Sequence, residues 1–103
     1  MPDTSIEIVN NAQERRWEAR ASGEVLGYSE YLETPGQIVF THTVVEPEHE
    51  GQGVGSRLAR AALDDAVARG MRITPICPFI RSYIQRHSQY ADSADLPSAP
   101  TGA

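Results

Sequence analysis

The chain has 103 residues, of which 40% are hydrophobic and 22% charged, and its formal net charge is −5. This length and composition are typical of one globular domain, and they exclude a disordered chain or one with two separate cores. No apolar run is long enough to span a membrane, and the negative net charge disfavours nonspecific nucleic-acid binding.

The charge is distributed unevenly along the chain. Residues 1–50 hold ten acidic side chains and three arginines, whereas residues 51–103 hold four acidic side chains and six arginines. The second half therefore favours an anionic ligand, and the first half a cationic or neutral partner. With one cysteine and no basic-then-apolar segment at the N-terminus, we expect a cytoplasmic protein without a secretory signal.

Three short strands with one polar face are predicted at residues 5–10, 15–21 and 24–33. Apolar and polar side chains alternate along each of them, and turn-forming residues separate them. In the third strand this alternation places Leu26 and Tyr28 on one side of the sheet. Strands of this kind are typical of an antiparallel meander.

Residues 37–46 predict a different kind of strand, because both of its alternating faces are apolar. Such a strand is covered on both faces at the centre of a sheet. The apolar spacing of residues 54–69 then predicts an amphipathic helix, with Gly70 as its C-terminal cap. A fifth strand at residues 71–77 completes a right-handed parallel crossover.

A second helix is predicted at residues 78–87, and it begins at Pro78, a residue suited to the first helical position. Beyond it Ser, Ala, Asp, Pro and Gly dominate, so we expect residues 91–103 to be a disordered C-terminal tail. Residues 1–90 would then form a single α/β domain.

Three glycines in five positions, Gly51, Gly53 and Gly55, directly precede the first predicted helix. A helix start carries unpaired backbone N–H groups and partial positive charge, and glycines let a phosphate approach that backbone closely. The P-loop and dinucleotide-binding fingerprints do not match, since no Lys-Ser/Thr follows and the GxGxxG spacing is absent. A plain tight turn is the alternative to a phosphate site.

The stretch VVEPEHEGQGVGSRLARAALDDAVARG, residues 44–70, resembles the acetyl-coenzyme-A-binding motif of the GCN5-related N-acetyltransferases (GNAT). With ITPICPFIRSYIQRHSQY, residues 73–90, the chain is similar to the very small, single-domain branch of that superfamily. The resemblance covers most of residues 5–90. It implies a minimal GNAT fold: a mostly antiparallel sheet, a parallel β-α-β crossover, fourth and fifth strands that splay apart, and a second helix.

The resemblance also implies that acetyl-coenzyme A is the cosubstrate. Backbone amides of the glycine loop would bind its pyrophosphate, and Val44 and Val45 would pair with its pantetheine arm. The leading Gln or Arg of the motif is Glu50 here, which puts a side-chain contact at that position in doubt. Arg57 and Arg60 are candidates for phosphate contacts, with solvated surface arginines as the alternative. The expected cofactor-binding residues are Val44, Val45, Gly51, Gln52, Gly53, Val54, Gly55 and Arg57.

Cys77 is a candidate catalytic residue, because it stands between a strand and a helix that begins with proline. A thiolate at a helix N-terminus is stabilised by the helix dipole. The thiol would then accept the acetyl group or line the thioester pocket. The alternative is a small buried apolar residue at a strand end.

A base and an acid are also needed for attack by an amine on a thioester. His42 is the base candidate, since strand alternation places it on one face with Phe40 and Val44; Glu46 and His49 are nearer the loop and could act through water. Tyr83 is the acid candidate, near the position where larger relatives carry the tyrosine that protonates the thiolate. A histidine bonded within the sheet and a packed tyrosine are the alternatives. His87 and Tyr90 are weaker candidates.

The resemblance implies acetyl transfer from acetyl-coenzyme A to a primary amine, on a small molecule or a peptide. The chain is much shorter than a typical member, so the acceptor pocket is open, supplied by a partner chain in a homodimer, or absent. An acetyl-coenzyme-A-binding module without catalysis is the alternative, and a phosphate-binding interaction domain is a third. The histidines lack metal-site spacing, so we expect no metal, and no nucleic-acid or membrane partner.

Overall fold

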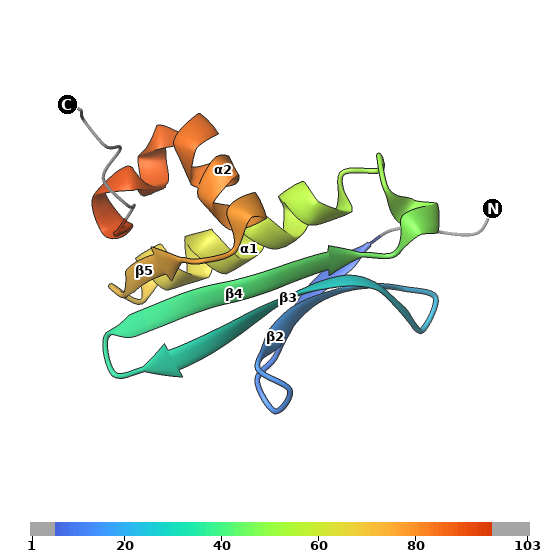
Figure 1. Cartoon of the computed structure of the whole chain (residues 1–103). Helices are drawn as coiled ribbons and strands as arrows, with labels where there is room; N and C mark the ends of the chain where they lie inside the picture. The colour runs from blue at the N-terminus through green and yellow to red at the C-terminus, as the bar shows by residue number, and fades with distance from the viewer. Residues whose placement is uncertain (1–5, 96–103) are drawn as a thin grey trace.

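The computed structural model describes residues 6–95, which form a five-stranded sheet with both helices on one face (Figure 1). The strands lie in the sheet in chain order; β1 to β4 are antiparallel, and β5 is parallel to β4. The predicted α/β fold is therefore confirmed. The elements are β1 (Glu7–Asn11), β2 (Arg16–Ala21), β3 (Glu24–Thr34), β4 (Gln37–Val45), η1 (Pro47–His49), α1 (Val54–Ala68), β5 (Arg72–Pro75), α2 (Pro78–Arg86) and η2 (Ser88–Ser93).

Helix α1 forms because its apolar residues recur on one face, and it ends where the sequence predicts. Gly70 has a φ of 69°, and its N–H donates to the carbonyl of Val67 while the N–H of Met71 donates to Ala66. This pair of hydrogen bonds is a Schellman cap, which favours glycine at the left-handed position. The cap turns the chain from α1 straight into β5.

The core lies between the sheet and the two helices. Phe40 of β4 is fully buried there against Leu63 of α1 and Ile80 of α2, which are also fully buried. A second cluster joins the first half of α1, through Leu58, to Ala19 of β2. Burial of this kind stabilises the fold by about 2 kcal/mol for each large apolar side chain. It also fixes the first turn of α1 against the end of the sheet.

Two β-bulges change which side chains of the sheet face the helices. In β3 the register with β2 shifts at Leu26, so Leu26 packs in the core while Tyr28 lies on the open face. The prediction that Leu26 and Tyr28 share one side is therefore wrong. In β4 the register with β3 shifts at Thr41, which separates Phe40 from the residues that follow it. An extra residue in a bulge reverses the alternation beyond it.

Strands β4 and β5 separate partway along their length, as predicted. Their pairing ends at Phe40 and Pro75, and the last bond across the pair runs from the N–H of Cys77 to the carbonyl of Phe40, at 2.9 Å. Strand β4 continues to Val45, whereas the chain after β5 turns into α2 (Figure 1). The last part of β4 therefore extends beyond its parallel neighbour.

The chain after α2 differs in part from the predicted tail. Residues 88–93 form η2, and Ala94 makes a parallel bridge to Ile73 of β5. The hydroxyl of Tyr90, a buried residue, donates to the Asp64 carboxylate of α1 at 2.6 Å. The rest of the predicted tail, residues 96–103, lies outside the described residues.

Candidate functional site

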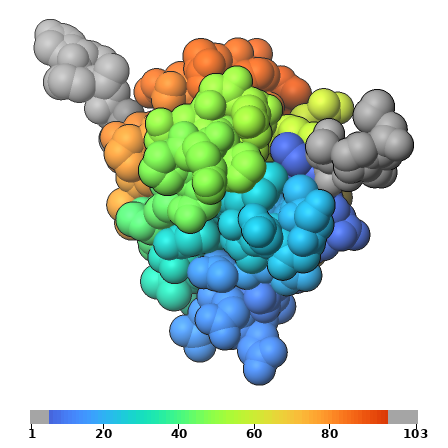
Figure 2. Space-filling view, turned by 90° about the vertical axis from the view of Figure 1, so that its right-hand side faces the viewer, coloured from blue at the N-terminus to red at the C-terminus, as the bar shows by residue number. Residues whose placement is uncertain are grey.

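A cavity of about 410 Å³ lies where the end of β4, the glycine loop and the first turns of both helices meet. Figure 2 shows this region of the surface, with the loop in green between α2 in orange and β3 in cyan. The end of β4, the loop and the first turn of α1 follow one another in sequence, and the first turn of α2 lies beside them where β4 extends past β5. The cavity is lined by Thr43, Val45, His49, Glu50, Gly51, Gly53, Val54, Gly55, Ser56 and Phe79.

The three glycines of the loop have two different structural roles. Gly51 and Gly53 have φ values of 84° and 77°, and a β-carbon on either would meet no atom within 4 Å. They are glycines because their backbone is left-handed. Gly55 has a helical backbone, but a β-carbon there would lie 2.7 Å from the Phe79 ring. Its small size lets α1 and α2 approach each other.

The first turn of α1 presents free hydrogen-bond donors to the cavity. Gly53 is the N-cap of α1 and supplies no side-chain cap. Among the described residues, the backbone N–H groups of Val54, Gly55 and Ser56 have no hydrogen-bond acceptor. No acidic residue lies in this first turn. The positive end of a 15-residue helix is therefore open to an anion.

The charged side chains around the cavity do not add to this positive end. Glu50 lines the cavity, and its lining residues include no arginine. Arg57, a predicted phosphate contact, donates instead from Nη2 to the carbonyl of Ile6 at 2.9 Å. His49 Nδ1 lies 3.1 Å from Gln52 Oε1. The hydrogen-bond donors that face this cavity are thus backbone N–H groups rather than cationic side chains.

The two valines predicted to contact the pantetheine arm lie on opposite faces of β4. Val45 lines the cavity, whereas Val44 lines a smaller hollow of about 190 Å³ on the open face of the sheet, beside Tyr28. Both belong to the part of β4 that continues beyond β5. An extended chain could pair with the backbone there, where the parallel neighbour has ended.

Cys77 lies behind the cavity wall and does not line the cavity. It is the N-cap of α2 and is 2% exposed. Its Sγ donates a hydrogen bond to Thr43 Oγ1 at 3.3 Å, and Thr43 Oγ1 lies 3.0 Å from Ser29 Oγ. The thiol is therefore the end of a buried polar chain that crosses from β3 through β4 to α2. Sequence reasoning missed Thr43 and Ser29, although each is a polar residue at a core-facing position.

The comparison with known proteins gives the family. A family model described as GCN5-related N-acetyl-transferase matches residues 16–93, which is most of the chain. The chain belongs to this family. The match contains the glycine loop, Cys77 and both helices, so the cavity is built from family elements.

Individual relatives agree with this family assignment. Protein NATD1 of Xenopus tropicalis is 28% identical over 90 residues, which cover 84% of this chain and 81% of that protein. A GCN5-like protein of Staphylococcus aureus, solved by NMR, has the same fold, with a TM-score of 0.69 and 22% identity over 98% of this chain and 97% of its own. A ribosomal-protein-alanine N-acetyltransferase of Brucella melitensis biovar Abortus 2308 matches with a TM-score of 0.51 and 24% identity, over 82% of this chain and 67% of its own.

The base candidate of this GNAT domain, His42, lies on the face opposite the cavity. The bulge at Thr41 separates it from Phe40, so the prediction that His42 and Phe40 share a face is wrong. His42 is exposed, and its ring lies 6.5 Å from that of Tyr28. A role for His42 as base therefore requires that the amine approach from the open face of the sheet.

The acid candidate, Tyr83, is packed between the helices and η2. Tyr83 is 6% exposed, its ring stacks on His87 at 3.9 Å, and it does not line the cavity. The Nδ1 atom of His87 lies 2.8 Å from the Tyr83 carbonyl oxygen. Phe79, one turn earlier on α2, is the aromatic side chain that lines the cavity.

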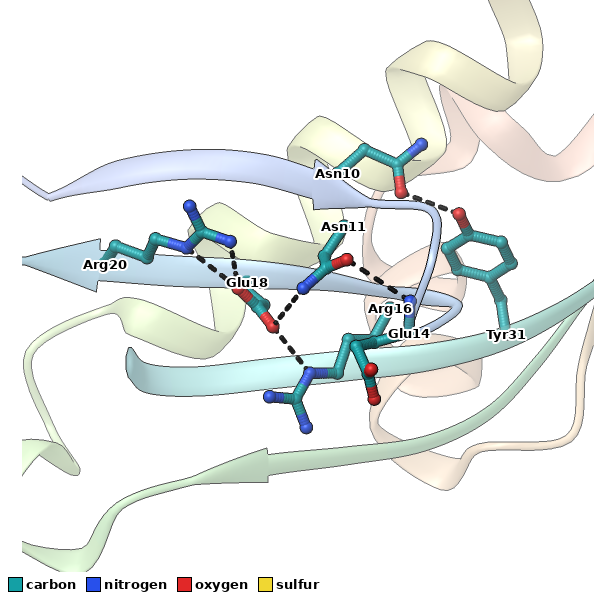
Figure 3. A network of polar contacts seen from close by, with 7 residues as sticks. All are labelled: Asn10, Asn11, Glu14, Arg16, Glu18, Arg20 and Tyr31. Atoms are coloured by element: carbon teal, nitrogen blue, oxygen red, sulfur yellow. Dashed lines mark hydrogen bonds and ion pairs between the residues drawn. The ribbon is translucent and has the colours of Figure 1, made fainter. Parts of the chain in front are cut away.

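The open face of the GNAT sheet carries a buried carboxylate (Figure 3). Glu18 is 2% exposed, and it accepts hydrogen bonds from Arg16, Arg20 and Asn11. Burial alone would raise the pKa of Glu18, but these three hydrogen bonds outweigh it and hold the pKa below its usual value. Arg16 also lies over the Tyr28 ring, 4.4 Å from its centre. The network joins β1, β2 and β3 on the face that the helices leave open.

Within residues 6–95, no three or more His, Cys, Asp or Glu side chains are grouped so that they could hold a metal ion. In the same part of the chain, none of the helices has the length and apolar character needed to cross a membrane.

Proposed function

We propose that this GNAT protein transfers an acetyl group from acetyl-coenzyme A to a primary amine of a small molecule or a peptide. The observation that carries the proposal is the set of free N–H groups of Val54, Gly55 and Ser56 at the open end of α1, inside the family-matched segment. Donors of this kind bind a diphosphate without a lysine or a metal.

The residues present fit such a cosubstrate. Gly51 and Gly53 leave open space where side chains would otherwise stand, so a phosphate can approach the loop backbone. Val45 and Thr43 continue the cavity wall along β4, beyond the end of β5. When bound there, acetyl-coenzyme A supplies the activated acetyl group as a thioester. In our proposal the loop holds the anionic part, and β4 orients the arm.

The amine acceptor would approach from the open face of the sheet, because the helices and the loop occupy the other face. His42 is exposed on that face, close to the gap between β4 and β5. A neutral histidine there can accept the proton that the amine loses. The single cysteine supports the cytoplasm as the site of action, since it forms no internal disulfide.

The experiment is a release assay for free thiol, with acetyl-coenzyme A and a panel of primary amines that includes polyamines and basic peptides. We expect amine-dependent release that falls in Gly53→Ala and persists in Gly36→Ala. Gly36 has a similar φ of 80°, but it lies in the β3–β4 turn. Calorimetric binding of acetyl-coenzyme A with no release for any amine would favour a binding module, and no binding at all would overturn the proposal.

A further inference from the structure

Thr43 is the polar side chain that connects the cavity with the buried interior. It lines the cavity from the end of β4. On its inner side, its Oγ1 is hydrogen-bonded to two other groups, Ser29 Oγ at 3.0 Å and Cys77 Sγ at 3.3 Å. Both neighbours are buried, and Ser29 has no exposed surface. The direction of these bonds decides where the hydrogen of the Thr43 hydroxyl points.

The hydrogen-bond partners available to Ser29 and Cys77 determine that direction. In the described part of the chain, the hydroxyl of Ser29 has Thr43 Oγ1 as its single hydrogen-bond partner. A buried hydroxyl hydrogen without an acceptor is unfavourable, so Ser29 donates to Thr43. The thiol of Cys77 donates to the same oxygen. A hydroxyl oxygen has two lone pairs, and both are then occupied, so the hydrogen of Thr43 points away from its two buried neighbours.

We propose that Thr43 is a catalytic residue that donates this hydrogen to the sulfur atom of bound coenzyme A, with Ser29 and Cys77 as positioning residues. This assignment rests on the proposed function. A donor that itself accepts two hydrogen bonds is polarised, which strengthens the bond that it donates. A preorganised donor of this kind stabilises negative charge on a departing sulfur.

The assignment also gives the buried thiol a role that its position allows. Cys77 is 2% exposed and lies behind Thr43, so its sulfur does not reach the cavity. As a donor to Thr43 it fixes the hydroxyl from the side of α2, while Ser29 fixes it from β3. The two hydrogen bonds from Ser29 and Cys77 thus hold the hydroxyl hydrogen of Thr43 in place without a charged side chain.

The test measures the bound thiol directly, without turnover. Coenzyme A is titrated in complex with the protein, and its thiolate is followed by ultraviolet absorbance. Desulfo-coenzyme A, which lacks the thiol, serves as the blank for Cys77 and the tyrosines. We expect Thr43→Val to raise the pKa of the bound thiol by about one. The same variant should weaken thiolate binding about tenfold and leave the affinity for desulfo-coenzyme A unchanged. Thr43→Ser, which keeps the hydroxyl, should behave as the wild type.

A second variant tests the direction of the hydrogen without changing Thr43. In Ser29→Ala, the hydrogen of Thr43 should stay directed at the cavity, and the thiol pKa should rise by less than in Thr43→Val, because Thr43 loses one of the two hydrogen bonds that polarise it. If Thr43 donated to Ser29 instead, this variant would release the hydrogen and lower that pKa, which would overturn the assignment. An unchanged thiol pKa in Thr43→Val would overturn it as well, while the proposed function would stand. Failure of the wild type to bind coenzyme A would overturn both.

Discussion

A β-carbon on Gly55 would lie 2.7 Å from the Cζ atom of Phe79. The first turn of α1 and the first turn of α2 therefore touch at a position where a hydrogen atom replaces a side chain. Both residues also line the cavity. One contact thus sets the packing of the helices and the shape of the candidate site together.

Gly55→Ala tests this contact. Alanine stabilises a helix relative to glycine by up to about 1 kcal/mol, but here it displaces the Phe79 ring. We expect a loss of about 1 kcal/mol in the free energy of unfolding in the wild-type background, and a gain in the Phe79→Ala background, where the clash is absent. Urea denaturation of the wild type, the two single variants and the double variant measures the coupling between the two residues. Effects that add to within about 0.5 kcal/mol would mean that the two residues are not coupled.

Gly53→Ala and Gly36→Ala form a matched pair. Both positions have left-handed backbone, with φ of 77° and 80°, and open space where a β-carbon would stand. Each variant should lose about 1 kcal/mol of stability through backbone strain. Coenzyme A affinity should fall in Gly53→Ala alone, because that strain distorts the start of α1. Isothermal calorimetry measures it, and equal affinities for the two variants would argue against the loop as the binding element.

Glu18→Gln tests the buried network of the open face. Removing the charge weakens the hydrogen bonds from Arg16 and Arg20, whose own side chains are 26% and 42% exposed, so we expect a loss of about 2 kcal/mol at neutral pH. Because the pKa of Glu18 is lowered in the folded protein, its stabilisation is present above the unfolded-state pKa of about 4.3 and is lost as the pH falls through the folded-state pKa.

The pH dependence of the stability separates the effect of the Glu18 charge from that of an exposed carboxylate. The free energies of unfolding of wild type and Glu18→Gln, measured at several pH values, should begin to approach each other below about pH 4 and become equal only below the lowered folded-state pKa of Glu18. Glu33→Gln removes a carboxylate whose pKa is also lowered, chiefly by its hydrogen bond from Arg69, but that side chain is 37% exposed. Its loss should be smaller, about 0.5 kcal/mol. A constant gap between wild type and Glu18→Gln across the acidic range would contradict our account of the carboxylate.

Tyr90→Phe tests the contact that holds η2 on α1. Removing the hydroxyl leaves Asp64 without its donor, and we expect a loss of about 1–2 kcal/mol. Burial, and then the hydrogen bond to Asp64, raise the pKa of Tyr90 in the folded protein. The stabilisation is thus complete below the unfolded-state pKa of about 10 and is lost as the pH rises beyond it. The free energy of unfolding, measured at several alkaline pH values, should therefore fall less steeply with rising pH in Tyr90→Phe than in the wild type.

The order of the elements followed from local patterns, but the faces of the sheet did not. Alternation gave the strands, the order strand, helix, strand gave the crossover, and glycine and proline gave the helix ends, whereas the separation of β4 from β5 was implied by the family resemblance. It placed Leu26 beside Tyr28 and His42 beside Phe40, and both placements fail at bulges. A bulge depends on the register with the neighbouring strand, which alternation within one strand does not contain.

The site was predictable only where its geometry is local. The glycine loop and the helix start are contiguous in sequence, so their position at one cavity could be inferred. The hydrogen bonds that link Ser29, Thr43 and Cys77 join three elements and form only after those elements pack. The roles of Cys77, His42 and Tyr83 in catalysis stay predictions, and the structure places each of them outside the cavity lining.

The most direct test of the central claim is an NMR titration of backbone amides with coenzyme A. We predict that the N–H resonances of Val54, Gly55 and Ser56 shift the most, because these free donors bind the diphosphate. Pantetheine, which lacks the diphosphate, should leave the same resonances in place. Saturable binding of coenzyme A that leaves these three amides unperturbed would contradict the account.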